Sequence, residues 1–425
     1  MSAERVVRVG LLGFGTIGSS VYRLIQREHD EILAGTGVDL QVAKVLEIDR
    51  SKTAADVPAD TVTDDYADIV DDASIDIVVE VIGGTGVAFT FVDEALRKGK
   101  DVVTANKQLI ASRGEALFTL AKEESRHLRF EASVAGAVPI IKVMRESMVA
   151  AEVHTVYGIV NGTTNYILTR MYNEEGDYAD ILAEAQRLGY AEADPTADVG
   201  GGDAAAKMAI LGSIAFHSRV TLDDVACEGI QDITLDDVRY AKDLGFVVKL
   251  IGAARLIDGR VSVRVFPALL PQDHPLAAIG GSTNAVFVQG ETIGEIMLMG
   301  PGAGGMPTAT AVVSDIVSIA STKEVGVMQS CSCYRTLDFY PADEVESAFF
   351  IKLNVEDVSG VLAQISSVFG RHGVSIASMI QKGRGAEAEL VLITHPTQER
   401  GFFAAIAEAR GLACCKSEPM TLRVL

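Results

Sequence analysis

The sequence predicts an α/β protein in three parts: a doubly wound parallel sheet, a mixed α+β region, and a ferredoxin-like domain at the end of the chain. Three observations lead to this fold class. Short β-branched runs alternate with helical segments in the first third, as in a parallel sheet covered by helices on both faces. Longer strands of period-two or apolar character dominate the middle. Residues 347–425 then follow the order βαββαβ.

Composition narrows the possible functions before any motif is considered. The 425 residues are 48% hydrophobic and carry a formal charge of −21, so a nucleic-acid partner is not expected. The longest apolar runs are broken by glycine or charge before they could span a membrane. The first five residues lead into a strand pattern without a basic and apolar leader. We therefore expect a cytoplasmic protein with no membrane partner.

The first strand is predicted over residues 5–12, and a glycine-rich turn follows it directly. Residues 13–18 read G-F-G-T-I-G and open a helical segment. Gly13 allows the tight turn, Gly15 lets the backbone approach a pyrophosphate, and Gly18 lets the helix pack on the strand. The helix N-terminus then faces the phosphates. Strand, G-x-G-x-x-G and helix together predict a Rossmann-type dinucleotide-binding domain.

The second strand, predicted over residues 40–46, ends in a turn that contains both acidic and basic residues. An acidic side chain at this place binds the ribose hydroxyls of NAD, whereas a basic one accepts the 2′-phosphate of NADP. The turn offers Glu47 and Asp49 against Arg50 and Lys52. The choice between NAD and NADP therefore stays open.

Three further strands are predicted at residues 76–82, 101–104 and 128–133. Ligands of doubly wound sheets bind at the carboxyl ends of the strands. The residues that follow or end these three strands and could contact a ligand are Thr85, Lys107 and Glu131.

The middle of the chain has a different rhythm. A helix is predicted over residues 139–149 and a turn with a helix cap over 161–165, and four strands are predicted over 153–160, 246–256, 261–270 and 285–290. This pattern suggests a mixed sheet with helices on one face. A glycine-rich segment at residues 299–305 feeds a helix over 307–321, which we expect to return to the first domain.

The most informative stretch is residues 189–207, where four carboxylates and one lysine stand among small side chains. Asp203 and Lys207 are four residues apart on a helix that runs to about residue 216, so they share one face. That helix has almost no polar face, so both charges are expected to be buried. Buried groups need partners, and carboxylates beside a lysine suit an amino-acid substrate that exchanges a proton. The other carboxylates are Glu192, Asp194 and Asp198.

These observations predict the domain limits. A nucleotide-binding domain covers residues 1–135 and is completed by 306–325, a substrate-binding domain covers 136–305, a linker covers 326–346, and the ferredoxin-like domain covers 347–425. In the last domain, the loop at residues 356–360 has backbone amides that could hold a small ligand.

Several motifs together resemble those of homoserine dehydrogenases with a C-terminal ACT domain, and the match covers nearly the whole chain. Besides residues 13–18, the motifs are V-T-A-N-K at 103–107, F-E-A-S-V-A-G-A-V-P at 130–139, N-G-T-T-N at 161–165, G-Y-A-E-A-D-P at 189–195, G-D-A-A-A-K at 202–207 and G-P-G-A-G at 300–304. The stretch 189–207 is highly specific to that family.

The resemblance implies NAD(P)-dependent interconversion of L-aspartate 4-semialdehyde and L-homoserine, a step toward threonine, methionine and isoleucine. Lys207 would donate the proton, with Lys107 beside it, and Glu192, Asp203 and Asp198 would hold the substrate. The expected nucleotide contacts are Gly13, Phe14, Gly15, Thr16, Ile17, Gly18, Asp49, Thr85, Lys107, Gly189 and Gly302.

The resemblance also implies a monovalent cation, usually sodium, held by Glu131 and by the backbone oxygens of Val134, Gly136 and Val138. Threonine is the usual feedback ligand, bound by the ACT domain, and a homodimer or homotetramer is expected. The chain departs from many relatives at Ile48, where a basic residue is common, and at Ala206 and Ser359.

Two other functions are considered: a different Rossmann enzyme, such as a semialdehyde dehydrogenase or another amino-acid dehydrogenase, and a non-catalytic sensor. A semialdehyde dehydrogenase that forms an acyl intermediate needs a cysteine nucleophile, and none of Cys227, Cys331 and Cys333 lies at a predicted strand end beside the motifs. A non-catalytic sensor would join nucleotide binding to amino-acid binding. Such a sensor has no need for Glu192, Asp203 and Lys207 together.

Overall fold

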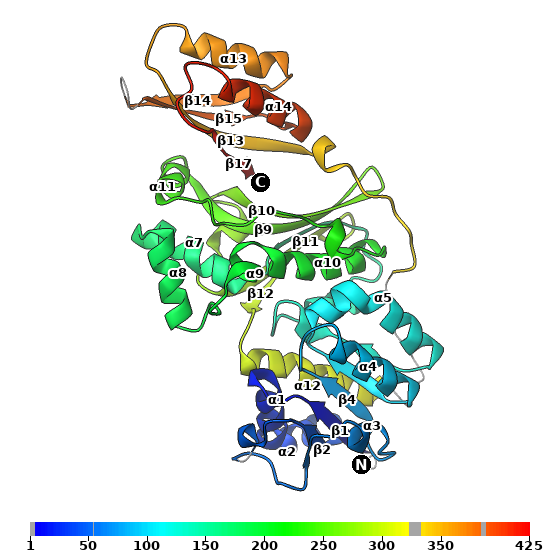
Figure 1. The fold of residues 1–425 in the computed structure, drawn as a ribbon. Coiled ribbons are helices and arrows are strands. Elements are labelled where there is room, and N and C mark those ends of the chain that lie inside the picture. The colour runs from blue at the N-terminus through cyan, green and yellow to red at the C-terminus, as the bar shows by residue number, and fades with distance from the viewer. Residues whose placement is uncertain (1–4, 54, 323–332, 384–387) are drawn as a thin grey trace.

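A computed structural model describes residues 5–53, 55–322, 333–383 and 388–425 of the chain. The molecule is elongated, with the N-terminal sheet at one end, the mixed sheet in the centre and the C-terminal domain at the other end (Figure 1). Within the described residues, every helix is too short or too polar to cross a bilayer.

The N-terminal sheet confirms the predicted doubly wound parallel fold. All of its strand pairs are parallel, in the order β3-β2-β1-β4-β5-β6. The strands are β1 (Arg5–Leu12), β2 (Val38–Leu46), β3 (Val62–Thr63), β4 (Ile77–Glu80), β5 (Asp101–Thr104) and β6 (Leu128–Arg129). The helices are α1 (Thr16–Arg27), α2 (His29–Thr36), α3 (Ala67–Val70), α4 (Val87–Arg97) and α5 (Lys107–Glu123).

The strand predicted over residues 128–133 is wrong beyond Arg129. The chain leaves the sheet there and forms a 3₁₀ turn, Glu131–Ser133, followed by helix α6 (Ile140–Lys142) and a π-helical turn, Val143–Ser147. The physical cause is Glu131, whose two carboxylate oxygens accept hydrogen bonds from the backbone N–H groups of Ile141 and Lys142. Capping this helix directs the chain away from strand pairing.

Helix α12 (Gly305–Thr322) is far from the first sheet in sequence but packs against it. Val312 and Ile316 share one buried cluster with Val9 and Val21. The helix touches α1 where Gly305 lies, since a Cβ there would come within 2.3 Å of the Ser20 hydroxyl. The chain thus passes from the first sheet to the central sheet between β6 and β7, and it returns to the first sheet between β12 and α12. Part of the predicted linker, residues 326–332, and residues 323–325 lie outside the described residues.

The central sheet is mixed, as predicted. Its main strands are β7 (Val153–Ile159), β9 (Phe246–Ile257), β10 (Arg260–Pro271), β11 (Thr283–Gly290) and β12 (Gly294–Pro301), and the short β8 (Ala226–Cys227) pairs with β10. Strand β12 includes the start of the glycine-rich segment, residues 299–301. Its proline is tolerated because β12 is an edge strand. The helices are α7 (Gly162–Glu174), α8 (Tyr178–Arg187), α9 (Thr196–Val199), α10 (Gly202–Phe216) and α11 (Leu235–Asp243).

Helix α10 lies against one face of this sheet at very close range. A Cβ on Gly252 of β9 would come within 2.3 Å of the Met208 side chain, and a Cβ on Gly212 of α10 would come within 3.0 Å of Val263. All residues of α10 after its first glycine are buried. The helix is therefore held tightly, and so are the charged residues on its first turns.

The C-terminal domain confirms the predicted βαββαβ order. Its elements are β13 (Glu346–Val355), α13 (Val361–Arg371), β14 (Ile376–Lys382), β15 (Ala388–Thr394), α14 (Glu399–Arg410) and β17 (Met420–Val424); the short β16 (Thr397–Gln398) pairs with β13. The domain has its own buried core. Strand β17 also pairs with β10, so the central and C-terminal sheets are continuous (Figure 1).

Candidate active site

The start of α10 places Asp203 and Lys207 together, as their spacing predicts. The Lys207 ammonium donates a hydrogen bond to Asp203 Oδ2 at 2.7 Å and another to the Val160 carbonyl at 2.6 Å. The two residues are 8% and 9% exposed, which confirms their predicted burial. Asp203 lies in the first turn, where the helix dipole favours a negative charge.

A second lysine, from the N-terminal domain, contacts the same carboxylate. Lys107 begins α5, and its ammonium is 3.0 Å from Asp203 Oδ1. Asn106 fixes the start of this helix, since its side chain accepts from the Leu109 N–H and donates to the Gly84 carbonyl. Each oxygen of the Asp203 carboxylate is therefore paired with one lysine, and the carboxylate joins the two domains.

The charges of this cluster are strongly coupled. Burial disfavours ionisation of Asp203, but Lys207 and Lys107 outweigh it, so the pKa of Asp203 lies well below its ordinary value. Burial tends to lower the pKa of Lys107, yet the pull of Asp203, with smaller ones from Asp198 and Glu192, leaves that pKa raised. Asp203 thus stays ionised and Lys107 stays protonated across the neutral range.

Asn161 connects Asp203 to a second carboxylate. Its Nδ2 donates to Asp203 Oδ2 at 2.9 Å and to Asp198 Oδ1 at 2.7 Å, while its Oδ1 caps α7 by accepting from the Thr164 N–H. Burial and the nearby Asp203 raise the pKa of Asp198, although hydrogen bonds from Asn161 and Thr163 oppose the rise. The sequence predicts only a capping role for Asn161. Its place in the N-G-T-T-N motif is the signal that could have indicated a role in the active site.

The other two carboxylates of the stretch 189–207 have different surroundings. Asp194 accepts hydrogen bonds from the N–H and hydroxyl of Thr196, the first residue of α9, so its role is local. Glu192 is exposed on the loop between α8 and α9 and makes no side-chain hydrogen bond with the described residues, although its charge acts on Lys107. The structure therefore groups Asp203, Lys207, Lys107 and Asp198 closely and leaves Glu192 at their rim.

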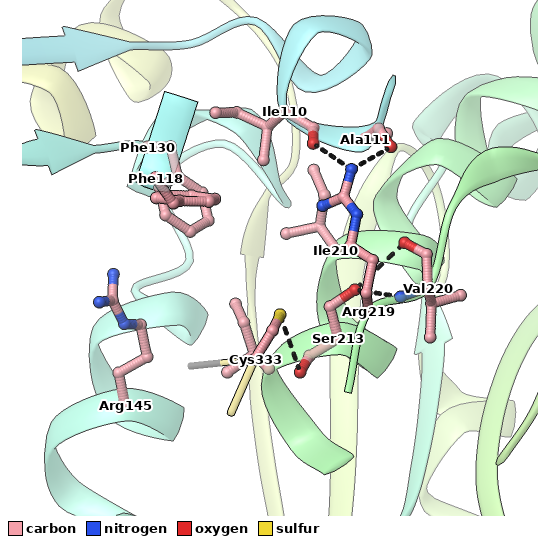
Figure 2. A pocket seen from close by; sticks show the side chains of 11 residues that line it. Ile110, Ala111, Phe118, Phe130, Arg145, Ile210, Ser213, Arg219, Val220 and Cys333 are labelled. Carbon is pink, nitrogen blue, oxygen red and sulfur yellow. Dashed lines mark hydrogen bonds between the residues drawn. The ribbon is translucent and has the colours of Figure 1, made fainter. Parts of the chain in front are cut away.

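Behind the lysines, α5 and α10 are joined through the segment that follows α10. Figure 2 shows Arg219 beneath α5, where its guanidinium donates to the Ala111 carbonyl at 3.0 Å and to the Ile110 carbonyl at 3.5 Å. The narrow pocket beside it is lined mainly by apolar side chains, among them Phe118 and Phe130, and has no carboxylate. This pocket does not suit a polar substrate. It belongs to the packing that fixes α5 relative to α10 and hence the Lys107–Asp203 contact.

The glycine-rich turn has the geometry that its pattern predicts. Gly13 has a φ of +96°, and a Cβ on Gly18 would lie 2.0 Å from the Gly13 carbonyl oxygen. A Cβ on Gly15 would meet no atom within 4 Å, so the space beside this residue is open. Helix α1 starts at Thr16 with no side-chain cap and no acidic residue in its first turn. Its first N–H groups are thus available to a phosphate.

The turn after β2 is organised by Glu47, which we had not included among the cofactor contacts. Its Oε2 accepts from the Phe14 N–H and its Oε1 from the Asp49 N–H, both at 3.0 Å. The signal was an acidic residue directly after the second strand. The Phe14 ring is buried, so only its backbone can face a nucleotide. Asp49 is exposed and caps a 3₁₀ turn, Arg50–Lys52, through Ser51.

The remaining predicted nucleotide contacts come from three different segments. Thr85 is exposed in the loop that Asn106 holds through Gly84, close to the start of α5. Gly189 is exposed just after α8, with a φ of +77°. Gly302 follows β12, and a Cβ on it would come within 2.0 Å of the buried Asn284 amide of β11. Ile17, on the first turn of α1, is half-buried.

Glu131 is 2% exposed and lies beside a second buried acid, Asp315, which accepts a hydrogen bond from the Glu131 N–H. Burial and the charge of Asp315 raise the pKa of Glu131 to about 7. Of the three carbonyls predicted to join it, that of Val138 accepts from the Ile140 N–H. No group of three or more His, Cys, Asp or Glu side chains suited to a metal occurs in the described part of the chain. A cation here would therefore depend on backbone oxygens.

Comparison with known proteins agrees with this geometry. A homoserine dehydrogenase family model matches residues 139–317, the NAD-binding domain model of homoserine dehydrogenase matches 13–131, and an ACT domain model matches 349–414. A homoserine dehydrogenase of Bacillus subtilis is 42% identical over 99% of this chain and 98% of its own length. One from Corynebacterium glutamicum is 44% identical over 92% of this chain and 90% of its own.

Solved structures show the same similarity. A homoserine dehydrogenase from Thiobacillus denitrificans is 37% identical, with a TM-score of 0.95 over 100% of this chain and 99% of that one. One from S. aureus is 31% identical, with a TM-score of 0.78 over 99% of both chains. Three domains, a shared chain length and a lysine–aspartate–lysine cluster at the domain junction lead to one conclusion: the chain belongs to the homoserine dehydrogenase family.

Proposed function

We propose that the chain interconverts L-homoserine and L-aspartate 4-semialdehyde with a nicotinamide cofactor, and that Lys207 moves the proton. The observation that carries this proposal is the Asp203 carboxylate, which binds Lys107 and Lys207 from two domains. A nucleotide held by one domain and a substrate held by the other would meet at this cluster. When bound, the cofactor supplies the hydride, and the protein supplies alignment and proton transfer.

Lys207 is well placed to give a proton to a carbonyl oxygen that becomes an alcohol. Its ammonium is fixed by Asp203 and by the Val160 carbonyl, which leaves a third N–H for the substrate. In the direction of oxidation, the neutral amine of Lys207 would take the hydroxyl proton and so return to the ammonium form. Asp203 holds the lysine in place for both steps. Lys107, whose side chain is 37% exposed, would contact the cofactor and the reacting oxygen.

The acidic groups around the lysines suit the ammonium of an amino-acid substrate. Asp198 is fixed by Asn161 and Thr163, and Glu192 lies at the rim. With Asp203 they supply three negative charges against two lysines, so an added ammonium group balances the site. This excess also distinguishes the enzyme from a nucleotide sensor, which gains nothing from such a cluster.

We further propose that both NAD and NADP are accepted. The turn after β2 exposes Asp49, which suits a ribose diol, and Arg50, which suits a 2′-phosphate. The nearest carboxylate to Arg50 is that of Asp64 at 3.5 Å, and both side chains are more than half exposed. Such a pair is weak and leaves the guanidinium available.

A monovalent cation such as sodium is proposed at Glu131, with the backbone oxygens of Val134, Gly136 and Val138. The residues fit a cation because two buried acids, Glu131 and Asp315, face one lysine, Lys142, 3.4 Å from Asp315. An added positive charge would stabilise the ionised form of Glu131. The cation's part is to hold the segment between β6 and α6 at the domain junction.

The ACT domain match supports regulation by an amino acid, and we propose that threonine, an end product of the route, is the ligand. A homo-oligomer formed through the central domain is proposed as well. Light scattering with and without L-threonine tests the assembly; a monomer at assay concentrations would contradict it.

The decisive experiment measures initial rates of L-homoserine oxidation with NAD and with NADP. Lys207→Ala should lower the rate by about 100-fold or more, because general acid–base catalysis contributes that much. Lys98→Ala, which removes an exposed lysine paired with Asp71, is the matched control and should leave the rate unchanged. A folded wild-type protein that binds nucleotide but oxidises no homoserine would contradict the enzyme and favour the sensor.

A further inference from the structure

Asn284 is a buried side chain that the proposed reaction does not use. It lies near the start of β11 and is 1% exposed, and neither its Oδ1 nor its Nδ2 has a hydrogen-bond partner among the described residues. A buried donor or acceptor without a partner destabilises a protein, so such groups are rare in folded chains. An amide that departs from this rule marks a place where a second arrangement of the chain would pair it.

The side chain of Asn284 points to the face of the central sheet that carries α10. Residues of a strand alternate between the two faces of a sheet. Val286, on the same face as Asn284, belongs to the buried cluster that contains Met208 of α10, whereas Phe287 belongs to the cluster on the other face. An apolar residue would suit such a position better than an amide without partners.

The Asn284 amide lies against the glycine-rich segment between β12 and α12. A Cβ on Gly302 would lie 2.0 Å from the Asn284 Cγ, 2.1 Å from Nδ2 and 2.3 Å from Oδ1. On its other side, Gly302 meets the segment that follows β6: a Cβ on Gly136 would lie 2.7 Å from the Gly302 carbonyl oxygen, and the Ala137 N–H donates to the Pro301 carbonyl at 3.1 Å. The chain at Gly302 is therefore enclosed between Asn284 and the connection from the first sheet to the central sheet.

Further along, the same segment meets the helix that follows the nucleotide turn. A Cβ on Gly305 would lie 2.3 Å from the Ser20 hydroxyl oxygen and 3.0 Å from the carbonyl oxygen of Thr16, the first residue of α1. Between these contacts, Ala303 and Gly304 are exposed and belong to neither a strand nor a helix. A nucleotide with its phosphates at the start of α1 would thus lie beside a segment that has room to adjust.

We propose that Asn284 positions the glycine-rich segment when the nucleotide binds. In the nucleotide-bound protein the segment shifts at Gly302, so that its backbone N–H and carbonyl groups pair with the Asn284 amide, whose Oδ1 accepts and whose Nδ2 donates. A nucleotide that contacts the segment only in this arrangement shifts the chain toward it. Asn284 acts through Gly302 and does not touch the nucleotide. The inference rests on the proposed function only in that a nicotinamide nucleotide binds.

Asn284 also borders the strand end that holds Lys207. Strand β11 pairs with β7 so that Ala285 is opposite Ile159, which places Asn284 beside Val160. The Val160 carbonyl accepts a hydrogen bond from the Lys207 ammonium at 2.6 Å. The bonds of the lysine do not involve the Asn284 amide. Loss of the amide should therefore act on nucleotide binding and leave proton transfer intact.

The test compares nucleotide affinity and thermal stability in Asn284→Leu. The full chain is titrated with NADPH, followed by the fluorescence of the dihydronicotinamide ring. Leucine keeps the branched shape but cannot pair with the segment, so NADPH should bind about tenfold more weakly. The Tm of the nucleotide-free variant should be unchanged or higher by up to about 3 °C, because an unpaired buried amide is removed. Asn284→Ala, which introduces no extra bulk, should weaken NADPH binding by a similar factor.

Steady-state kinetics separate positioning from catalysis. In homoserine oxidation by Asn284→Leu, KM for NADP should rise about tenfold while kcat changes by less than about twofold, because the pairing stabilises the bound nucleotide equally before and during the reaction. Asn354→Leu is the matched control. Asn354 also lies on a strand, β13, but its Nδ2 already donates to the Ser417 hydroxyl at 2.8 Å, in the C-terminal domain. This variant should bind NADPH as the wild type does.

Unchanged NADPH affinity in both Asn284→Leu and Asn284→Ala would overturn the inference. So would a fall in kcat with an unchanged KM for NADP, and so would a fall in the Tm of both nucleotide-free variants by more than about 5 °C, which would show that the amide already stabilises the free protein. A chain that binds NADPH with the help of Asn284 but oxidises no homoserine would contradict the proposed function and leave the positioning role standing.

Discussion

Two buried carboxylates, Asp203 and Glu399, each join two domains by binding two cations. Asp203 accepts one lysine from the nucleotide-binding domain and one from α10. Glu399 accepts one arginine from β10 and one from β17. Both are less than 10% exposed, and the pKa of both is lowered: burial resists ionisation in each case, but the paired cations prevail, and for Glu399 the value is about 2.

The difference between the clusters lies in the cations. Arginine does not lose its proton in proteins, and its planar fork satisfies a carboxylate on both oxygens, so the Glu399 cluster is closed and structural. Lysine binds as a point charge, keeps unused N–H groups, and can exchange its proton. The same charge arrangement therefore serves chemistry at one junction and attachment at the other.

The largest expected effect comes from removing the carboxylate between the lysines. Asp203→Asn should lower kcat/KM for homoserine oxidation on the order of 100-fold, because Lys207 loses the group that positions it. Asp194→Asn is the matched control, since that exposed carboxylate accepts hydrogen bonds only from Thr196 among the described residues. Steady-state kinetics measure kcat/KM for both variants. Nearly wild-type activity in Asp203→Asn would show that the Asp203 cluster is structural, like the Glu399 cluster.

The pH dependence of the rate should separate the two kinds of cation. Asp203 remains ionised and Lys107 remains protonated from about pH 5 to 9, given the directions of their pKa shifts. Neither group should therefore change the oxidation rate between about pH 5 and 9. Lys207→Arg should abolish the activity across this range, since arginine is no base at these pH values. Steady-state kinetics measure the rates, and an active Lys207→Arg variant would count against Lys207 as the group that moves the proton.

Glu399→Gln should act on stability and not on chemistry. Removing one partner of a buried pair costs about 3–5 kcal/mol. Here Arg264 loses its ion pair with Glu399, while Arg423 keeps its ion pair with Glu228 at 2.8 Å. Wild-type stability from this group is fully present above pH 4.5 and is lost as the pH falls toward about 2, since the folded pKa is lowered. Denaturant unfolding measures the change. A loss of activity in well-folded Glu399→Gln would contradict a purely structural role of the Glu399 cluster.

Glu131 is a third buried carboxylate, and within the described residues it forms no ion pair, although the charge of Lys142 acts on it. Its folded pKa is raised from 4.5 to about 7, so it stabilises the fold fully below pH 4.5 and loses that contribution as the pH rises through 7. The loss is on the order of 3 kcal/mol. At pH 8, the protein should therefore unfold at a higher temperature in sodium chloride than in choline chloride. Glu131→Gln should abolish this difference between the two salts. Equal curves in both salts would contradict the cation.

The smallest effect is expected at an exposed pair of similar length. Arg410 and Glu418 are 2.7 Å apart, as are Arg264 and Glu399, but both side chains are 66% exposed. Water already solvates these charges, so Glu418→Gln should shift Tm by no more than about 2 °C. Differential scanning calorimetry of Glu418→Gln and Glu399→Gln compares the two shifts in Tm. Equal shifts would show that burial does not decide how much an ion pair stabilises the fold.

Local pattern was enough for much of this protein. The glycine spacing at residues 13–18 predicted the nucleotide turn, the i,i+4 spacing of Asp203 and Lys207 on an apolar helix predicted a buried pair, and alternation predicted βαββαβ in the last domain. Each of these features depends on contacts between residues a few positions apart. The periodicity of helix and strand records such contacts directly.

Tertiary structure decided what depends on how distant segments dock. The contact of Lys107 with Asp203, the bridge that Asn161 makes between Asp198 and Asp203, and the pairing of β17 with β10 each join segments separated by dozens of residues or more. The carboxylate of Glu131 ended a strand that periodicity had extended to residue 133, because a cap formed ten residues later outweighed local propensity. Such contacts leave no periodic trace in the sequence, since they are selected by the packing of whole domains.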